Sequence, residues 1–138
     1  MGDLLTSDLF ILKVPDIDTI GRFSRCSGLE LSFEMFEYAE GGNNDFVWKL
    51  PGRVHFPNLV LERGLTNEDA LLKWFGQTKT KAETKQITLT IKSGSRERTF
   101  TFGDAFPVRW TGPSFDANAT TVGTESLEIA HSGLVLPT

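Results

Sequence analysis

Apolar and polar residues alternate along much of this chain, which is the pattern of β-strands with one buried face. Residues 86–92 and 98–102 alternate on either side of a Ser-Gly-Ser turn at residues 93–95, which predicts a hairpin. Other strands are expected at residues 8–14, 21–27, 29–35, 106–110 and 124–130. The pattern therefore predicts a mainly β fold, an antiparallel sandwich or barrel.

Residues 28–64 predict a long hairpin arm. A strand leads through a polar turn into an apolar loop at residues 46–52, and a second strand returns. At Phe36 the apolar residues change to even positions, so either a bulge lies near residues 35–36 or the strand crosses from the core into an interface. Pro57 removes a ladder donor, so the returning strand starts at Asn58 or lies at a sheet edge.

The apolar loop of this arm is expected to contact another molecule, because connections lie on the surface. The alternative is that Trp48 folds back onto the core of its own chain. The residues expected in a subunit or ring interface are Phe36, Tyr38, Phe46, Val47, Trp48 and Leu50.

One short α-helix is expected at about residues 67–75. Thr66 and the polar residues after it suit a helix start, with acidic side chains near the positive end of the helix dipole. Leu71, Leu72 and Phe75 form an apolar stripe, and Gly76 is expected to end the helix. Trp74 is expected to pack into the core against the sheet.

Composition limits the classes of protein that fit. The 138 residues suggest a single domain, residues 1–138, and a net charge of -4 argues against a nonspecific nucleic-acid binder. The single cysteine, Cys26, excludes an intramolecular disulfide. We find no run apolar enough to insert in a membrane and no basic start of a signal peptide, so we expect the chain to fold in a reducing cytoplasm.

Catalytic, cofactor and metal sites are not predicted. His55 and His131 lie in separate strand-like segments, neither has the i, i+4 spacing of a metal-binding helix, and Cys26 has no neighbouring thiol. The sequence leaves open a nucleophilic Cys-His pair, because the members of such a pair meet in space and not in sequence. Glu30 and Glu34 share a strand face, which fits paired carboxylates of a hydrolase but fits a solvated face better.

Several short motifs, taken in order, resemble a known family. They are Ser27-Gly28-Leu29 and residues 40–43 (EGGN), 49–52 (KLPG), 58–64 (NLVLERG), 72–75 (LKWF), 104–107 (DAFP) and 113–117 (PSFDA). Together they are similar to the inner-tube proteins of contractile phage tails and phage-tail-like injection systems. The resemblance covers nearly the whole chain.

The resemblance implies a structural, non-enzymatic subunit that is made in the bacterial cytoplasm and incorporated into a phage tail or tail-like particle. Such subunits form six-membered rings that stack into a hollow tube, and four strands per subunit give an inner barrel of about twenty-four strands. The implied partners are copies of the chain itself, a surrounding sheath, baseplate and spike proteins, and DNA or an effector protein as cargo in the lumen.

A wet barrel interior needs strands with one polar face. We hypothesise that Glu30, Ser32, Glu34, Thr88, Thr90 and Thr99 face the lumen, where the acids would repel DNA or an acidic passenger. A tube initiator that joins the first ring to the spike is an alternative function. A monomeric β-sandwich module that binds carbohydrate or peptide is a second alternative.

Overall fold

The computed structural model describes residues 9–39, 41–42, 47–66, 68–114 and 123–137. Within these residues the elements are β1 (Leu9–Val14), β2 (Asp18–Phe23), β3 (Arg25–Ser27), β4 (Ser32–Tyr38), β5 (Trp48–His55), β6 (Leu59–Gly64), α1 (Ala70–Thr80), β7 (Lys85–Ser93), β8 (Arg96–Thr111), β9 (Thr124–Ala130) and β10 (Gly133–Leu134). All described strand pairs are antiparallel, and the predicted mainly β fold is confirmed.

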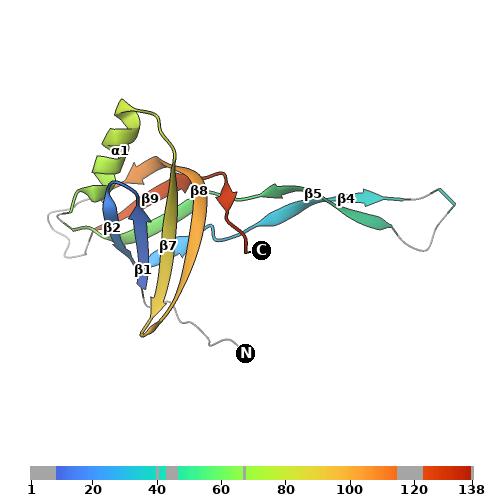
Figure 1. Ribbon diagram of the computed structural model, residues 1–138, viewed down its shortest axis with the longest axis horizontal. Coiled ribbons are helices and arrows are strands. Elements are labelled where there is room, and N and C mark those ends of the chain that lie inside the picture. Colours follow the sequence, from blue (N-terminus) through green and yellow to red (C-terminus); the bar gives the residue numbers. More distant parts are fainter. Residues whose placement is uncertain (1–8, 40, 43–46, 67, 115–122, 138) are drawn as a thin grey trace.

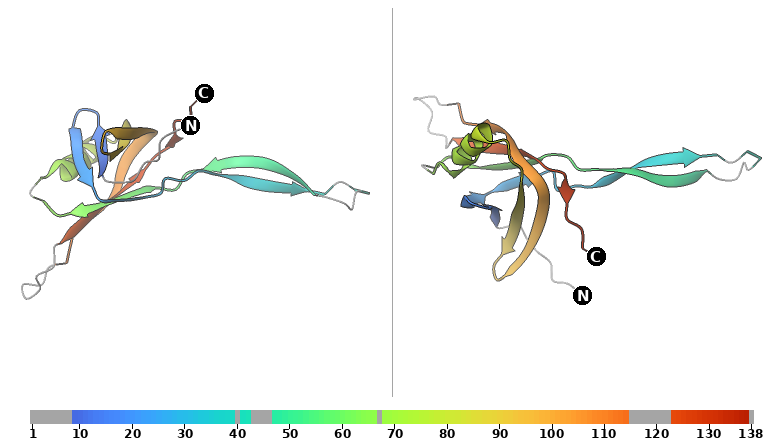
Figure 2. Two further views of the ribbon diagram at one scale, coloured as in Figure 1. Left: turned by 90° about the horizontal axis from the view of Figure 1, so that it is seen from below. Right: turned by 45° about the horizontal axis from the view of Figure 1, so that its top comes forward.

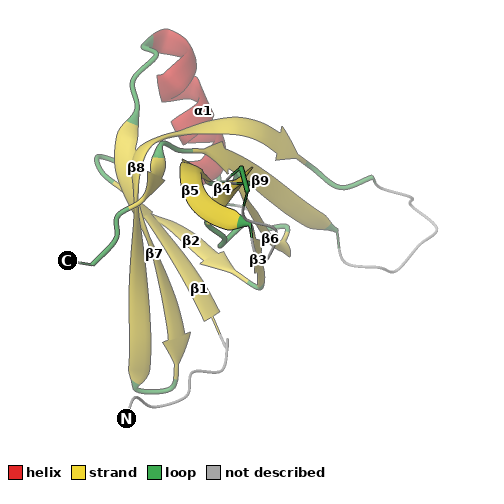
Figure 3. Cartoon of the chain, turned by 90° about the vertical axis from the view of Figure 1, so that its right-hand side faces the viewer, coloured by secondary structure: helices red, strands yellow, loops and turns green. Residues whose placement is uncertain are grey.

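The body of the molecule is one sheet bent into two layers. Its strand order is β2-β1-β7-β8-β9-β6-β3, and β10 pairs with β8. β8 belongs to both layers, because its first half pairs with β7 and its second half pairs with β9. Figure 3 shows β8 curving from the side of β7 to the side of β9. Register shifts at Lys85/Ile87 and at Pro107/Arg109 mark the bend, since an irregular ladder lets a strand change direction.

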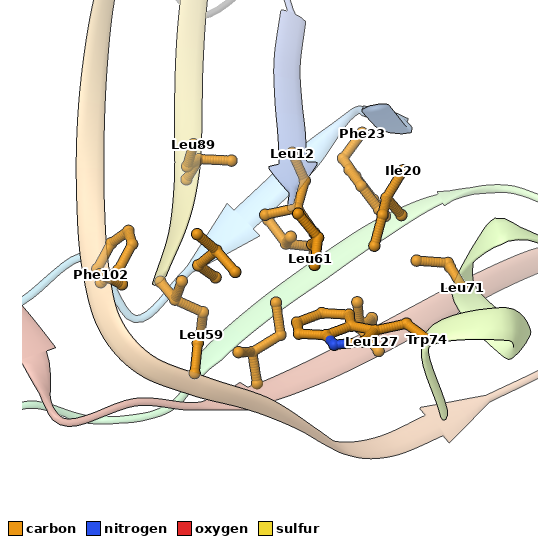
Figure 4. Close-up of a cluster of buried hydrophobic side chains, with 14 of the residues drawn as sticks. Leu12, Ile20, Phe23, Leu59, Leu61, Leu71, Trp74, Leu89, Phe102 and Leu127 are labelled. Atoms are coloured by element: carbon orange, nitrogen blue, oxygen red, sulfur yellow. The ribbon is translucent and has the colours of Figure 1, made fainter. Parts of the chain in front are cut away.

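The hydrophobic core lies between these two layers, with α1 at one end (Figure 4). One layer contributes side chains such as Leu12, Leu89 and Phe102, and the other contributes side chains such as Leu61 and Leu127. Each of them alternates with more exposed neighbours along its strand, as the sequence pattern predicted.

The chain changes layer at Ser24, which corrects the predicted continuous strand at residues 21–27. β2 ends at Phe23 and β3 begins at Arg25. The Ser24 backbone nitrogen donates to the Glu62 carbonyl at 3.0 Å, and the Ser24 hydroxyl donates to the same oxygen at 3.2 Å. These bonds hold the corner beside β6.

The helix is longer and later than predicted. It runs from Ala70 to Thr80 and therefore continues past Gly76. The hydroxyls of Thr78 and Thr80 donate to the carbonyls of Trp74 and Gly76, and Lys81 ends the helix in an extended conformation. The core position of Trp74 is confirmed, since its side chain is fully buried.

Two details of the helix prediction are wrong. The first turn contains no acidic side chain, because the helix begins only after Asp69. Leu72 belongs to the predicted apolar stripe but is 50% exposed, because it lies on the side of α1 that faces away from the sheet.

Candidate assembly surfaces

A two-stranded arm projects from the body of the domain. β4 and β5 pair only with each other among the described strands, and Figures 1 and 2 show them extending well beyond the two layers. All seven residues of β4 are exposed. An isolated hairpin with no further layer is only marginally stable in water.

The structure corrects two sequence expectations for the arm and agrees with a third. Most of the expected loop at residues 46–52 is strand, because β5 begins at Trp48. Phe33 and Met35 were expected on a buried face but are 59% and 55% exposed. The register shifts between Phe33 and Met35, so a ladder irregularity occurs close to the predicted bulge.

One side of the arm carries four large apolar side chains in register. Phe36 lies opposite Leu50, and Tyr38 lies opposite Trp48. Because alternate residues of a strand point to the same side, the four side chains form one surface, here called the arm face. Gly52 makes room beside them, since a Cβ atom there would lie 2.4 Å from the Phe36 ring.

The arm face unites most of the predicted interface residues. Phe36, Tyr38, Trp48 and Leu50 are between 48% and 57% exposed, and neighbouring Val47 is 46% exposed. Trp48 is therefore not part of the core of its own chain. The sixth predicted residue, Phe46, lies outside the described residues. Whether these side chains form an interface stays a prediction.

Specific contacts stabilise the root of the arm, some within the arm and some between the arm root and the body. Glu34 and His55 bring their side chains to 2.9 Å across the two arm strands. Behind them, His131 Nε2 donates to the Pro57 carbonyl at 3.1 Å, and the His131 ring packs edge-on against Phe56 and Phe102. Burial lowers the pKa of His131, although the bond to Pro57 opposes that shift.

A groove of about 640 Å³ lies beside the arm root. Its walls are the segment before β4, the first half of β8 and the C-terminal residues 134–137. β10 covers the adjoining edge of β8 at Gly103 and Phe102, and the Val135 nitrogen adds a bond to the Thr101 carbonyl. Over residues 97–100, the described part of the chain provides no strand on this edge. A sheet edge without a neighbouring strand presents backbone donors and acceptors.

The side of β2-β1-β7-β8 that faces away from the core is a polar surface, here called the open face. Ile11 lies between Arg22 and Thr90, and Thr90 lies opposite Thr99 with the two hydroxyls 3.0 Å apart. The members of the open face are Leu9, Ile11, Lys13, Arg22, Thr88, Thr90, Lys92, Glu97, Thr99 and Thr101, of which Thr90 is buried.

The six predicted lumen residues are distributed over different places. Thr88, Thr90 and Thr99 lie together on the open face. Ser32 and Glu34 lie in β4, on the arm. Glu30 precedes β4 and lines the groove. The assignment of all six to a lumen stays a prediction.

A buried polar cluster was missed by the sequence reasoning. Arg63 and Glu125 form an ion pair in which both side chains are almost fully buried, and the Trp110 indole nitrogen donates to Glu125 at 3.0 Å. The available signal was the strand period of two: Arg63 follows Leu59 and Leu61 at every second position, so a charged residue falls on the core face.

The described residues contain no group of three or more His, Cys, Asp or Glu side chains that could hold a metal ion. Burial raises the pKa of the Cys26 thiol to about 11, which disfavours the nucleophilic thiolate. Among the helices of the described residues, none has the length and apolar character to cross a membrane.

A two-layer β domain that has a projecting apolar arm, and whose described residues leave the β8 edge unpaired at residues 97–100, has the features of a structural assembly subunit. The chain belongs to the family of T4-like virus tail tube protein gp19, whose family model matches residues 7–135. The predicted resemblance is therefore confirmed, and the chain is a structural tube component. A comparison with curated proteins found no match.

Similar solved structures come from contractile injection systems. A chain in the cryo-EM structure of the anti-feeding prophage baseplate, 6-fold symmetrised, is 26% identical with a TM-score of 0.77, covering 98% of this chain and 96% of that chain. A chain in the PVC sheath-tube complex in the extended state is 27% identical with a TM-score of 0.78, covering 96% and 90%. A chain in the PVC sheath/tube terminator in the extended state is 26% identical with a TM-score of 0.79, covering 98% and 97%.

Proposed function

We propose that copies of this chain form six-membered rings that stack into the inner tube of a contractile tail or injection particle. The observation that carries the proposal is the arm face, an ordered row of exposed aromatic and aliphatic side chains on a member of the tail tube family. Exposed apolar patches of this kind mark protein interfaces. Similarity to chains from a sixfold baseplate and a sheath-tube complex supports the ring and its neighbours.

The sheet supplies a way to close the ring. β2 and the first half of β8 are the two edges of the four-stranded layer β2-β1-β7-β8. Pairing the β8 edge of one copy with the β2 edge of the next satisfies both ladders and continues around a circle. Six copies with four strands each give a cylinder of about twenty-four strands with a central passage.

The arm supplies the second contact. The arm face binds a neighbouring subunit or the adjacent ring. This contact buries Trp48 and the other three side chains of the arm face, and it stabilises the stack of rings along the tube axis. A sheath surrounds the tube, and a baseplate and spike complex starts it. DNA or an effector protein passes through the lumen, and the subunit itself has no catalytic role. The chain is made in the bacterial cytoplasm and incorporated there into the particle.

Negative-stain microscopy of the purified chain, alone and with its native baseplate complex, tests the proposal. Sixfold annuli or tubes are expected. A chain that stays single in concentrated gel filtration and forms no annulus on the baseplate would overturn it and favour a ligand-binding module. A single ring that forms on the baseplate but never elongates would instead identify a tube initiator.

A further inference from the structure

The open face differs in charge from the rest of the chain. Among its described residues it carries three basic side chains, Lys13, Arg22 and Lys92, and one acidic side chain, Glu97. The whole chain has a net charge of -4. Three basic side chains minus one acidic side chain give the described face a net charge of +2, on a chain that is acidic as a whole.

The single acid on this face is already paired. Glu97 lies opposite Lys92, and its carboxylate is 3.9 Å from the Lys92 ammonium group. Lys13 and Arg22 are exposed, and no ion pair joins either of them to an acid among the described residues. Their charges are thus available to a partner.

Beside these cations, on β7 and β8, lies a block of hydroxyl groups, of which Thr90 is buried and hydrogen-bonded to Thr99. Thr90 and Thr99 face each other in the ladder, and so do Thr88 and Thr101. Threonine hydroxyls donate and accept hydrogen bonds but bury little apolar area, so they favour many weak contacts over one tight one. A surface of this kind suits a partner that moves along it and is not held at one position.

We infer that the open face is a contact surface for an acidic polypeptide. The inference deepens the proposed function and rests on it, because in a ring closed by β2 and β8 this face lines the passage. Carboxylates of the passenger meet Lys13 and Arg22, and its backbone exchanges hydrogen bonds with Thr88, Thr99 and Thr101, which are exposed or half-buried. Glu34 and Glu30, the two acids of the predicted lumen set, lie on the arm and beside the groove and are not part of the open face.

Nucleic acid fits this surface less well. Nonspecific binding of nucleic acid relies on clustered Lys and Arg along the backbone and on exposed aromatic rings for stacking. The described open face offers three separated cations and no aromatic side chain. A polypeptide with spaced carboxylates matches it more closely.

The test measures fluorescence anisotropy of labelled poly-glutamate, poly-lysine and a short DNA duplex with the purified chain at low and moderate salt. We expect salt-sensitive binding of poly-glutamate, weaker binding of the duplex and none of poly-lysine. The double variant Lys13→Glu, Arg22→Glu should weaken poly-glutamate binding about tenfold, since two exposed attractions become repulsions. The matched control is Lys79→Glu, Lys81→Glu, which reverses two exposed charges at the end of α1 and should leave binding unchanged.

Three results would overturn the inference: no binding of poly-glutamate, equal loss in the control variant, or tighter binding of the duplex than of poly-glutamate. Microscopy of the same samples separates this outcome from the proposed function. Intact rings without selectivity for poly-glutamate refute the inference alone. Absent rings refute the proposed function, whatever the probes show.

Discussion

Arg63 and Glu125 lie directly opposite each other in neighbouring strands, with Arg63 Nε 2.6 Å from Glu125 Oε1. They continue the row of buried pairs Leu59–Ile129 and Leu61–Leu127, so an ion pair occupies a position that apolar pairs occupy elsewhere in the same ladder. The guanidinium also lies 5.1 Å from the centre of the Phe23 ring, which joins β6 to the other layer. The pair therefore holds both layers at one end of the core.

Loss of one member of this pair should be strongly destabilising. Arg63→Met leaves the Glu125 carboxylate buried without its cation, and we expect a loss of about 3–5 kcal/mol in the free energy of unfolding. The double variant Arg63→Met, Glu125→Leu should recover much of that loss, since no uncompensated charge remains. Urea denaturation measures both. A single variant within about 0.5 kcal/mol of the parent would contradict this account.

Substitutions at Trp48 and Trp74, two of the three tryptophans, should distinguish effects on assembly from effects on folding. Trp48→Ala removes a ring that is 48% exposed, so we expect a change in stability below about 1 kcal/mol together with impaired tube formation. Trp74→Ala empties a fully buried site and should cost about 3–5 kcal/mol. Urea denaturation and sedimentation of the same samples give both readouts. Equal destabilisation by the two variants would show that Trp48 supports the fold of its own chain.

Cys26 should be slow to react in the folded protein. With a pKa of about 11 in place of 9.0, its thiolate fraction at mildly alkaline pH falls about a hundredfold. Alkylation by iodoacetamide, followed by mass spectrometry, should therefore be slow in buffer and rapid in urea. Folded protein that reacts as fast as a free thiol peptide would show that the β3 edge opens readily.

His131 should make stability depend on pH. Burial is the main cause of its lowered pKa, so the folded state favours the neutral ring, while the unfolded chain binds a proton near 6.5. The contribution is therefore complete above pH 6.5 and is lost as the pH falls below that value towards the folded pKa. Urea denaturation between about pH 7.5 and about pH 5 measures the slope.

Two variants test whether the pH dependence of the free energy of unfolding comes from His131 at the arm root. His131→Asn should flatten the dependence, because it removes the titrating ring that contacts Pro57 and Phe102. His55→Asn keeps His131 and should retain the part of the slope that His131 contributes. An unchanged slope in His131→Asn would refute this role.

Local pattern was sufficient to predict much of the body. Strict alternation at residues 86–92 and 124–130 placed Ile87, Leu89, Leu127 and Ile129 in the core, because a strand has only two faces and one of them must avoid water. The same logic located β1 and the β7-β8 hairpin, and the apolar stripe of the helix predicted the buried Trp74. It failed where a strand serves two layers: residues 106–110 alternate, yet Phe106 and Val108 are exposed on the far side of the bent β8.

The sequence by itself determined the β class, the core rows, the presence of an apolar arm and the family resemblance, because each depends on residues close together in the chain. Only the tertiary structure decided that β2 and β3 divide at Ser24, that Arg63 meets Glu125, and that Phe36, Tyr38, Trp48 and Leu50 share one face. It also separated the threonines of the open face from the acids of the arm. The physical reason is that strand register and layer exchange are set by contacts between distant segments, and no local periodicity records them.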